Sequence, residues 1–257
     1  MNSALKMFDL SGRRALITGS SAGIGLALAR GLAGAGASIV LNGRDAAKLE
    51  QAAASLREAG ATVHALAFDV GSSEAVAEGI ARIEREIGAI DILVNNAGMQ
   101  HRAPLEDFPA AKWHELMRTN VDSVFFVGQA VARPMIARKR GKIINICSVM
   151  SEVGRAGIAP YTATKGAVKM LTKGMAIDWG PHGIQVNGIG PGYIKTELNA
   201  ALIANPEFNQ WVIGHTPARR WGEVGDLVGA AVFLASDASN FVNGHILYVD
   251  GGITATL

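Results

Sequence analysis

Short apolar runs of strand-like composition alternate along the chain with longer, alanine-rich segments of helical periodicity. The short runs predict β-strands and the segments between them predict helices. Seven such runs occur, at residues 14–18, 38–42, 62–68, 90–95, 142–148, 185–189 and 245–249. Because helical crossovers join neighbouring strands in parallel, the alternation predicts a doubly wound α/β fold, a seven-stranded parallel sheet with helices on both faces.

Two of these runs indicate how deeply the sheet is buried. Residues 90–94 and 142–146 are close to continuously apolar, which is typical of parallel strands covered on both faces. We find no internal repeat or linker, so residues 1–257 are expected to form a single domain. The longest stretch outside the alternation, at about 190–222, predicts a lid over a substrate site, because long segments of this kind are commonly functional.

A glycine-rich turn follows the first predicted strand. Residues 18–25 read Thr-Gly-Ser-Ser-Ala-Gly-Ile-Gly and lead directly into a helical segment. Glycine allows the tight turn, the close approach of backbone to a pyrophosphate and the packing of helix on strand, while the free amides of the helix face the anion. The spacing therefore predicts a dinucleotide-binding turn, although glycines also serve in plain strand-to-helix connections.

The end of the second predicted strand bears on the choice of dinucleotide. A carboxylate there would bind the ribose diol of NAD and repel the extra phosphate of NADP, but this chain has Asn42-Gly43-Arg44. The guanidinium of Arg44 offers a planar fork for a 2′-phosphate, which favours NADP. The alternatives are an exposed arginine that caps the following helix, and some use of NAD through Asp45.

Three further groups follow in order. Residues 95–98 read Asn-Asn-Ala-Gly after the fourth predicted strand, Ser148 closes the fifth, and Tyr161 and Lys165 lie beyond it. Pro160 favours a helix start, and residues i and i+4 share one face of a helix, so the spacing places the Lys165 ammonium near the Tyr161 phenol. Taken alone, such a tyrosine and lysine usually belong to a solvated helix face.

Together with the glycine turn and Asp-Gly-Gly at 250–252, these groups resemble the motifs of the short-chain dehydrogenase/reductase family, in the same order and over the whole chain. The resemblance implies a Rossmann fold, an NADP-dependent enzyme that moves hydride to or from a hydroxyl or keto carbon, and a homotetramer. The cofactor contacts that it implies are Gly19, Ser21, Gly23, Ile24, Gly25, Arg44, Asp69, Val70, Asn96, Ala97, Gly98, Tyr161, Lys165, Pro191, Gly192, Ile194 and Thr196.

The same resemblance implies the catalytic roles. Tyr161 would be general base in oxidation and general acid in reduction, Ser148 would hold the substrate oxygen, and Lys165 would grip the nicotinamide ribose. A free phenol has a pKa near ~10, so lowering it by two or three units requires about 3 to 4 kcal/mol of selective phenolate stabilisation. Asn120 matches the family's asparagine whose main chain holds a water, or its side chain simply satisfies a neighbouring backbone group.

Four stretches narrow the substrate. Residues 95–102, 144–148, 162–169 and 216–222 are similar to those of gluconate 5-dehydrogenases, which interconvert D-gluconate and 5-keto-D-gluconate with NADP(H). The resemblance implies a sugar-acid substrate, and Arg102 is our candidate for its carboxylate contact, with a solvated surface arginine as the alternative. The neighbouring segments place three more basic residues at the cleft: His101, Arg155 and Lys195.

Two residues qualify this interpretation. Glu152 follows Ser148 closely and either binds sugar hydroxyls or a cation, or is an ordinary loop carboxylate. Many NADP-specific relatives carry a second basic group within the glycine turn, but residue 22 here is alanine. Selectivity for NADP would therefore rest on Arg44, with Ser21 in support.

Composition excludes several other classes. The net charge is only +2 and the basic residues are scattered, so nucleic acid is not expected as a partner. No apolar run reaches the ~18 residues that a membrane span needs, and residues 1–19 lack a signal-peptide pattern. A single cysteine, Cys147, predicts a buried thiol and suits the reducing cytoplasm. We assign no metal ligand.

Two other functions stay open at this point. A different reductase of the same fold would act on a 3-oxoacyl thioester or on a polyol or other sugar. A regulator that binds NADP without turnover would keep the fold but would not need Ser148, Tyr161 and Lys165 intact.

Overall fold

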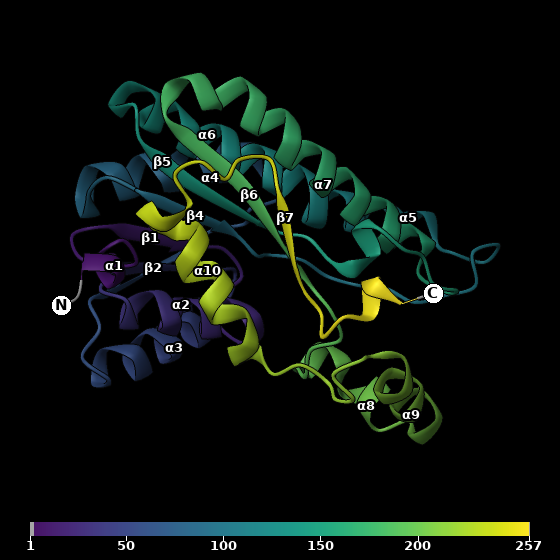
Figure 1. The fold of residues 1–257 in the computed structure, drawn as a ribbon. Coiled ribbons are helices and arrows are strands. Elements are labelled where there is room, and N and C mark those ends of the chain that lie inside the picture. Colours follow the sequence, from purple (N-terminus) through teal and green to yellow (C-terminus); the bar gives the residue numbers. More distant parts are fainter. Residues whose placement is uncertain (1–2, 257) are drawn as a thin grey trace.

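The computed structural model describes residues 3–256, and its centre is a sheet of seven parallel strands in the order β3-β2-β1-β4-β5-β6-β7 (Figure 1). This confirms the predicted doubly wound fold. The strands are β1 (Arg14–Ile17), β2 (Ser38–Gly43), β3 (Val63–Ala67), β4 (Ile92–Asn95), β5 (Gly141–Ile146), β6 (Ile184–Pro191) and β7 (Ile246–Val249).

Helices cover both faces of the sheet (Figure 1). Their bounds are α1 (Ser3–Lys6), α2 (Gly23–Gly34), α3 (Ala46–Glu58), α4 (Ser73–Arg82), α5 (Ala110–Met117), α6 (Ser123–Arg138), α7 (Ala159–Trp179), α8 (Ala200–Ile203), α9 (Pro206–His215) and α10 (Val228–Ala235). One buried apolar cluster joins the sheet to α2, α3 and α10, and a second joins it to α4, α6 and α7. Successive strand residues such as Leu16 and Ile17 point into opposite clusters, which is why these strands are apolar at nearly every position.

Two predicted strand ends differ from the structure by two residues. β5 ends at Ile146, not at residue 148, because the Ser148 side chain caps a short 3-10 turn, η3 (Val149–Ser151). β6 continues to Pro191, which pairs with Val249, so the segment predicted as a lid leaves the sheet after 191 and not at 190. That segment contains α8 and α9, which project beyond the sheet layers (Figure 1). No helix among residues 3–256 is long and apolar enough to cross a bilayer.

A row of polar side chains crosses the second apolar cluster. Asn95 of β4 donates to Asn145 Oδ1 of β5 at 2.9 Å, and Asn145 donates to Thr172 Oγ1 of α7 at 2.9 Å. Asn95 and Asn145 are register partners, and all three residues are buried. Buried amides need partners, so this polar row fixes α7 against β4 and β5.

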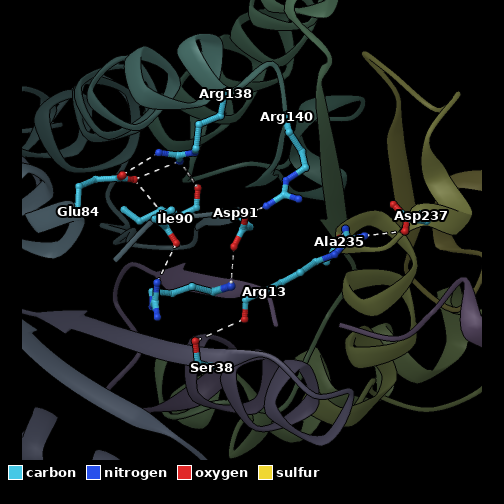
Figure 2. Close-up of polar contacts among 11 residues, drawn as sticks. Arg13, Ser38, Glu84, Ile90, Asp91, Arg138, Arg140, Ala235 and Asp237 are labelled. Atoms are coloured by element: carbon cyan, nitrogen blue, oxygen red, sulfur yellow. Dashed lines mark hydrogen bonds and ion pairs between the residues drawn. The ribbon is translucent and has the colours of Figure 1, made fainter. Parts of the chain in front are cut away.

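Several ion pairs lie at the edge of the sheet where the strands begin (Figure 2). Asp91 accepts from the backbone of Arg14 at 3.0 Å and from Arg140 at 2.7 Å, while Arg138 and Glu84 pair at 2.8 Å. These partly exposed pairs contribute at most about 1 kcal/mol each, but they tie β1, β4 and α6 together far from the glycine turn.

A buried lysine lies close to the same edge. Lys142, the second residue of β5, is 4% exposed, and its ammonium donates to Asn240 Oδ1 at 2.8 Å and Ser239 Oγ at 3.3 Å. Arg13, whose partner is Asp237 at 2.7 Å, is a further charge near it. The ammonium is therefore bonded to two neutral oxygens.

Candidate active site

The glycine turn joins β1 to α2 in a conformation that side chains would obstruct. Gly19 has φ +60°, and a Cβ there would lie 2.8 Å from the Cα of Ala97. A Cβ on Gly25 would lie 2.5 Å from Asn96 Nδ2 and 2.5 Å from the Gly19 carbonyl oxygen. Both positions therefore need glycine for close packing, as the motif predicts.

The first turn of α2 is open to an anion. Gly23 has φ +56° and nothing lies within 4 Å of the position that its Cβ would take. Ala22, the N-cap, supplies no side-chain hydrogen bond to the free amides of this 12-residue helix. Residues 22–25 also line a large cavity, so these amides and the positive end of the helix dipole are available to a phosphate.

The Asn-Asn-Ala-Gly loop after β4 is fastened to the glycine turn. Asn96 Nδ2 donates to the carbonyl oxygens of Thr18 and Gly19, each at 2.9 Å. The backbone amides of Asn96 and Ala97 both donate to Thr18 Oγ1 at 3.0 Å. The Asn96 side chain and the Thr18 hydroxyl thus hold the glycine turn and this loop in a fixed relation.

A cavity of about 330 Å³ lies at the carboxyl edge of the sheet and joins three groups of residues. At one end is the glycine turn with Asn96 and Gly98, and in the middle are Ser148, Tyr161 and Lys165. At the other end are Arg102, Arg155 and Tyr193, with residues 196–199 and Leu202 from the segment after β6. A cleft at the carboxyl ends of parallel strands is where doubly wound folds bind ligands.

Ser148 is buried at the head of η3. Its Oγ accepts from the amide of Met150 at 3.1 Å, which leaves the hydroxyl hydrogen free to donate. Ser151, in the same turn, donates to the Lys165 carbonyl oxygen at 2.9 Å. The turn that carries Ser148 is therefore anchored on the helix that carries the tyrosine and lysine.

Tyr161 and Lys165 lie in the first two turns of α7, which begins at Ala159 with Pro160 in its first turn. The Lys165 side chain is buried, and its ammonium donates to the Ile146 carbonyl oxygen at 2.7 Å. The same nitrogen lies 5.7 Å from the centre of the Tyr161 ring. The structure thus places a cation beside the phenol in a cleft, as the spacing predicts.

Asn120 lies in a π-helical turn, η2 (Arg118–Asp122), between α5 and α6. Its side chain is fully engaged: Oδ1 accepts from the Met99 amide at 2.8 Å, and Nδ2 donates to the Met99 carbonyl at 2.9 Å and Thr164 Oγ1 at 3.1 Å. The side chain therefore satisfies neighbouring groups, as the alternative interpretation held. A π-turn breaks the regular carbonyl pattern of a helix, so the predicted main-chain role stays a prediction.

The other predicted cofactor contacts fall into two sets. Pro191, Gly192, Ile194 and Thr196 line the cavity beside Gly19, Gly23, Ile24, Gly25 and Gly98. Five predicted contacts lie outside the cavity lining: Ser21, Arg44, Asp69, Val70 and Ala97. Ala97 packs on Gly19, and the rest follow β1, β2 and β3 at the same edge of the sheet.

At the end of β2 the Arg44 side chain is exposed, whereas the Asp45 carboxylate is engaged in capping a helix. Arg44 is exposed directly after β2, and Ser21 Oγ is near Gly43, 3.9 Å from where its Cβ would lie. Asp45 caps α3, because its carboxylate accepts from the amides of Ala47 and Lys48 at 3.0 and 3.1 Å. Asp45, and not Arg44, is therefore the helix cap, which leaves the Arg44 guanidinium free for a ligand.

Asp69 is also partly engaged. Its Oδ1 accepts from the Gly71 amide at 2.9 Å, and its Oδ2 lies 3.9 Å from Arg118 Nη1. The neighbouring Val70 is buried, and its side chain belongs to the second apolar cluster.

The end of the cavity that is predicted to bind substrate differs in part from expectation. Arg102 lines it and donates to Gln100 Oε1 at 2.7 Å, and Arg155 lines it as well. Three neighbours, His101, Lys195 and Glu152, do not line the cavity, and each has another partner. His101 packs edge-on against Phe108, Lys195 pairs with Glu223 at 2.6 Å, and Glu152 accepts from Lys169 and from Tyr248 at 2.8 Å.

Sequence reasoning missed Tyr193, Ile158 and Leu202, which also line the cavity. No motif marks them; only the position of Tyr193, two residues after Pro191, could have suggested it. Within residues 3–256 no group of three or more histidine, cysteine or acidic side chains could hold a metal ion.

Comparison with known proteins gives matches over the full chain. A family model described as enoyl-(acyl carrier protein) reductase matches residues 19–254. The chain is 61% identical to the gluconate 5-dehydrogenase of Gluconobacter oxydans over 98% of each chain. It is 50% identical to the 5-keto-D-gluconate 5-reductase of Escherichia coli, over 96% of this chain and 97% of the relative.

Solved structures agree. A gluconate 5-dehydrogenase from Burkholderia cenocepacia, in complex with NADP and tartrate, is 59% identical and superposes with a TM-score of 0.97 over 99% of this chain and 100% of that chain. The motifs, the sheet order and these full-length matches agree with one another, and the chain belongs to the short-chain dehydrogenase/reductase family.

Proposed function

We propose that this chain is an NADP-dependent oxidoreductase that interconverts D-gluconate and 5-keto-D-gluconate. One observation supports this most directly: a single cavity connects Ser148, Tyr161 and Lys165 to two guanidiniums, those of Arg102 and Arg155. A sugar acid carries both groups that this cavity suits, a hydroxyl to react at the tyrosine and a carboxylate to bind the arginines. The full-length identity to gluconate 5-dehydrogenase supports the same substrate.

The residues present fit an NADP molecule. The close contacts that a Cβ would make at Gly19 and Gly25, and the free amides at the start of α2, fit a pyrophosphate. Arg44, with Ser21 near Gly43, would hold the 2′-phosphate, and Asp69 with the Val70 backbone would face the adenine. Lys165 would bind the ribose hydroxyls. When bound, the cofactor supplies or accepts the hydride.

The chain's own groups handle the proton. In oxidation the Tyr161 oxygen takes the proton from the substrate hydroxyl, and in reduction the same phenol returns a proton to the carbonyl oxygen. The Lys165 ammonium stabilises the phenolate, since it lies 5.7 Å from the ring centre in a cleft of low dielectric. Ser148 donates its free hydroxyl hydrogen to the same substrate oxygen and orients it.

The segment after β6 would act as the lid of this site. Ile194, residues 196–199 and Leu202 line the cavity from one side, and a short bridge between Ile194 and Gly222 joins the two ends of the segment. A lid excludes water and strengthens the electrostatic contacts within the site. A single domain over residues 1–257, a homotetramer and a cytoplasmic location complete the proposal; light scattering and cell fractionation test the last two.

A steady-state assay with 5-keto-D-gluconate and NADPH tests the proposed function. We expect saturable oxidation of NADPH and much weaker turnover with a 3-oxoacyl thioester or a neutral polyol. Preference for the thioester would contradict the sugar-acid assignment, and NADP binding without turnover on any of these substrates would support a regulator. The cavity of about 330 Å³ with two guanidiniums favours the sugar acid over a long acyl chain.

A further inference from the structure

Two polar groups at the lid end of the cavity lack partners. Arg155 Nε and the Tyr193 hydroxyl are both buried, and neither makes a hydrogen bond within the described residues. Both side chains line the same cavity as Ser148 and Tyr161. A buried donor without an acceptor is costly, so a pair of them in one cavity indicates a ligand that supplies the acceptors.

Aromatic side chains of the lid segment hold both groups in place. The Arg155 guanidinium lies 4.8 Å from the centre of the Phe208 ring, where it makes a cation–π contact. The Tyr193 ring packs edge-on against Phe208, Trp211 and Trp221, with centres 5.7, 5.9 and 5.7 Å apart. These contacts engage the ring of Tyr193 and the face of the guanidinium, and they leave the hydroxyl and Nε free to donate.

The charges around this end of the cavity favour an anion. Burial lowers the pKa of Arg102, and the charge of Arg155 lowers it further, so two guanidiniums repel each other across the cavity. Burial raises the pKa of Tyr193, against the opposing effect of Arg155 and Arg102, so its hydroxyl stays protonated and donates. Glu197 also lines the cavity, but it is exposed and forms no ion pair with either guanidinium in the described part of the chain.

We propose that Arg155 and Tyr193 form the subsite for the substrate carboxylate and thereby make the enzyme specific for sugar acids over neutral polyols. One carboxylate would accept from Arg155 Nε and from the Tyr193 hydroxyl, which supplies the two missing acceptors. Arg102 is exposed and already donates to Gln100. It therefore adds positive charge near the carboxylate but does not make the principal contact. The inference rests on the proposed function, because it assigns the acid end of the same substrate.

The test compares D-gluconate with D-glucitol, which differ only in a carboxylate or a hydroxymethyl group at carbon 1. The quantity measured is the ratio of the two kcat/KM values with NADP, from which the concentration of active enzyme cancels. We expect Arg155→Met to lower this ratio by about 100-fold and Tyr193→Phe by about 10-fold, through the KM for gluconate. Arg155→Lys should restore part of the preference, and the Kd for NADP should not change.

Lys195→Met is the matched control. It removes a positive charge from the same segment, but Lys195 pairs with Glu223 outside the cavity, so the ratio should stay at the wild-type value. If Arg155→Met and Tyr193→Phe keep the wild-type preference for gluconate, the carboxylate binds elsewhere and the inference is wrong while the proposed function stands. If the wild-type protein itself turns over D-glucitol as well as D-gluconate, both the sugar-acid assignment and the inference fail.

Discussion

Replacing the buried Lys142 with methionine is expected to stabilise the protein at neutral pH. The pKa of Lys142 falls from 10.5 to about 8, mainly because the side chain is buried and partly because of the charge of Arg13, while Asp237 opposes the change in part. In the unfolded chain the lysine regains its ordinary pKa. The folded state therefore pays for holding a proton at this site below pH 8, and Lys142→Met removes that cost while keeping a side chain of similar length.

The magnitude follows from the two pKa values. A fall from 10.5 to about 8 corresponds to at most about 3.4 kcal/mol, at about 1.4 kcal/mol for each pKa unit. The substitution also loses the hydrogen bonds to Asn240 and Ser239, which reduces this figure. Ser239 Oγ keeps its own bonds to two carbonyl oxygens, and Asn240 is exposed to water, so that loss is small. We expect a net gain of about 1 to 2 kcal/mol at pH 7.

The pH dependence has a definite sign. Below pH 8 both states hold the proton and the full cost is present; between pH 8 and 10.5 the unfolded state binds more protons, so the wild-type protein gains stability as the pH rises. Above 10.5 the cost is gone. The advantage of Lys142→Met should therefore be greatest at pH 7 and should shrink toward pH 10.

Urea unfolding of both proteins at several pH values from 7 to 10 measures this advantage. Lys48→Met, at an exposed position of α3, controls for the loss of a positive charge and should change stability little at any pH. A Lys142→Met protein that is less stable than the wild type at pH 7, or an advantage that does not vary with pH, would refute the reasoning.

Three further substitutions test the site. Tyr161→Phe should leave the Kd for NADP within a few-fold but lower kcat by at least ~100-fold in steady-state assays, and retained turnover would rule out its role as general acid and base. Arg44→Ala should raise the Kd for NADPH by about 10-fold more than the Kd for NADH in fluorescence titrations, because only NADPH carries the 2′-phosphate. Equal increases for both cofactors would exclude that contact. Gly25→Ala should lower the free energy of unfolding by about 1 to 3 kcal/mol, measured by thermal unfolding, and should weaken the binding of NADPH. The reason is that the new Cβ would lie 2.5 Å from Asn96 Nδ2. An unchanged melting temperature would show that the turn can relax.

The sheet could be predicted from sequence because parallel strands that are buried on both faces are apolar at nearly every position. The exceptions are local. Ser148 continues the extended backbone of β5, yet its side chain caps η3, so periodicity alone could not end the strand at Ile146. The helix around Asn120 reads as continuous, but a π-turn interrupts it, which no propensity signals. Cys147 is buried, as predicted.

The candidate site also contains residues that the sequence predicts and residues that it does not. Gly25, Tyr161 and Lys165 line the predicted cleft because their positions follow from local turns and from one helix face. Arg155 and Tyr193 acquire their importance from aromatic residues of the lid that are distant in sequence, so spacing could not identify Tyr193 or reveal the free donors. Charged residues next to a motif were the least predictable, since each could turn toward a partner outside the cleft.

The buried row of Asn95, Asn145 and Thr172 has a consequence for how such enzymes diversify. Replacing any one of the three leaves a buried amide or hydroxyl of its neighbour without a hydrogen-bond partner, so these positions resist stepwise replacement. Residues 196–199 and Leu202, which line the cavity, are partly or fully exposed, so replacing them leaves fewer buried polar groups without a partner. Selection for a new substrate can therefore remodel the rim of the pocket freely, while the scaffold that aligns the proton-transfer residues is inherited nearly intact.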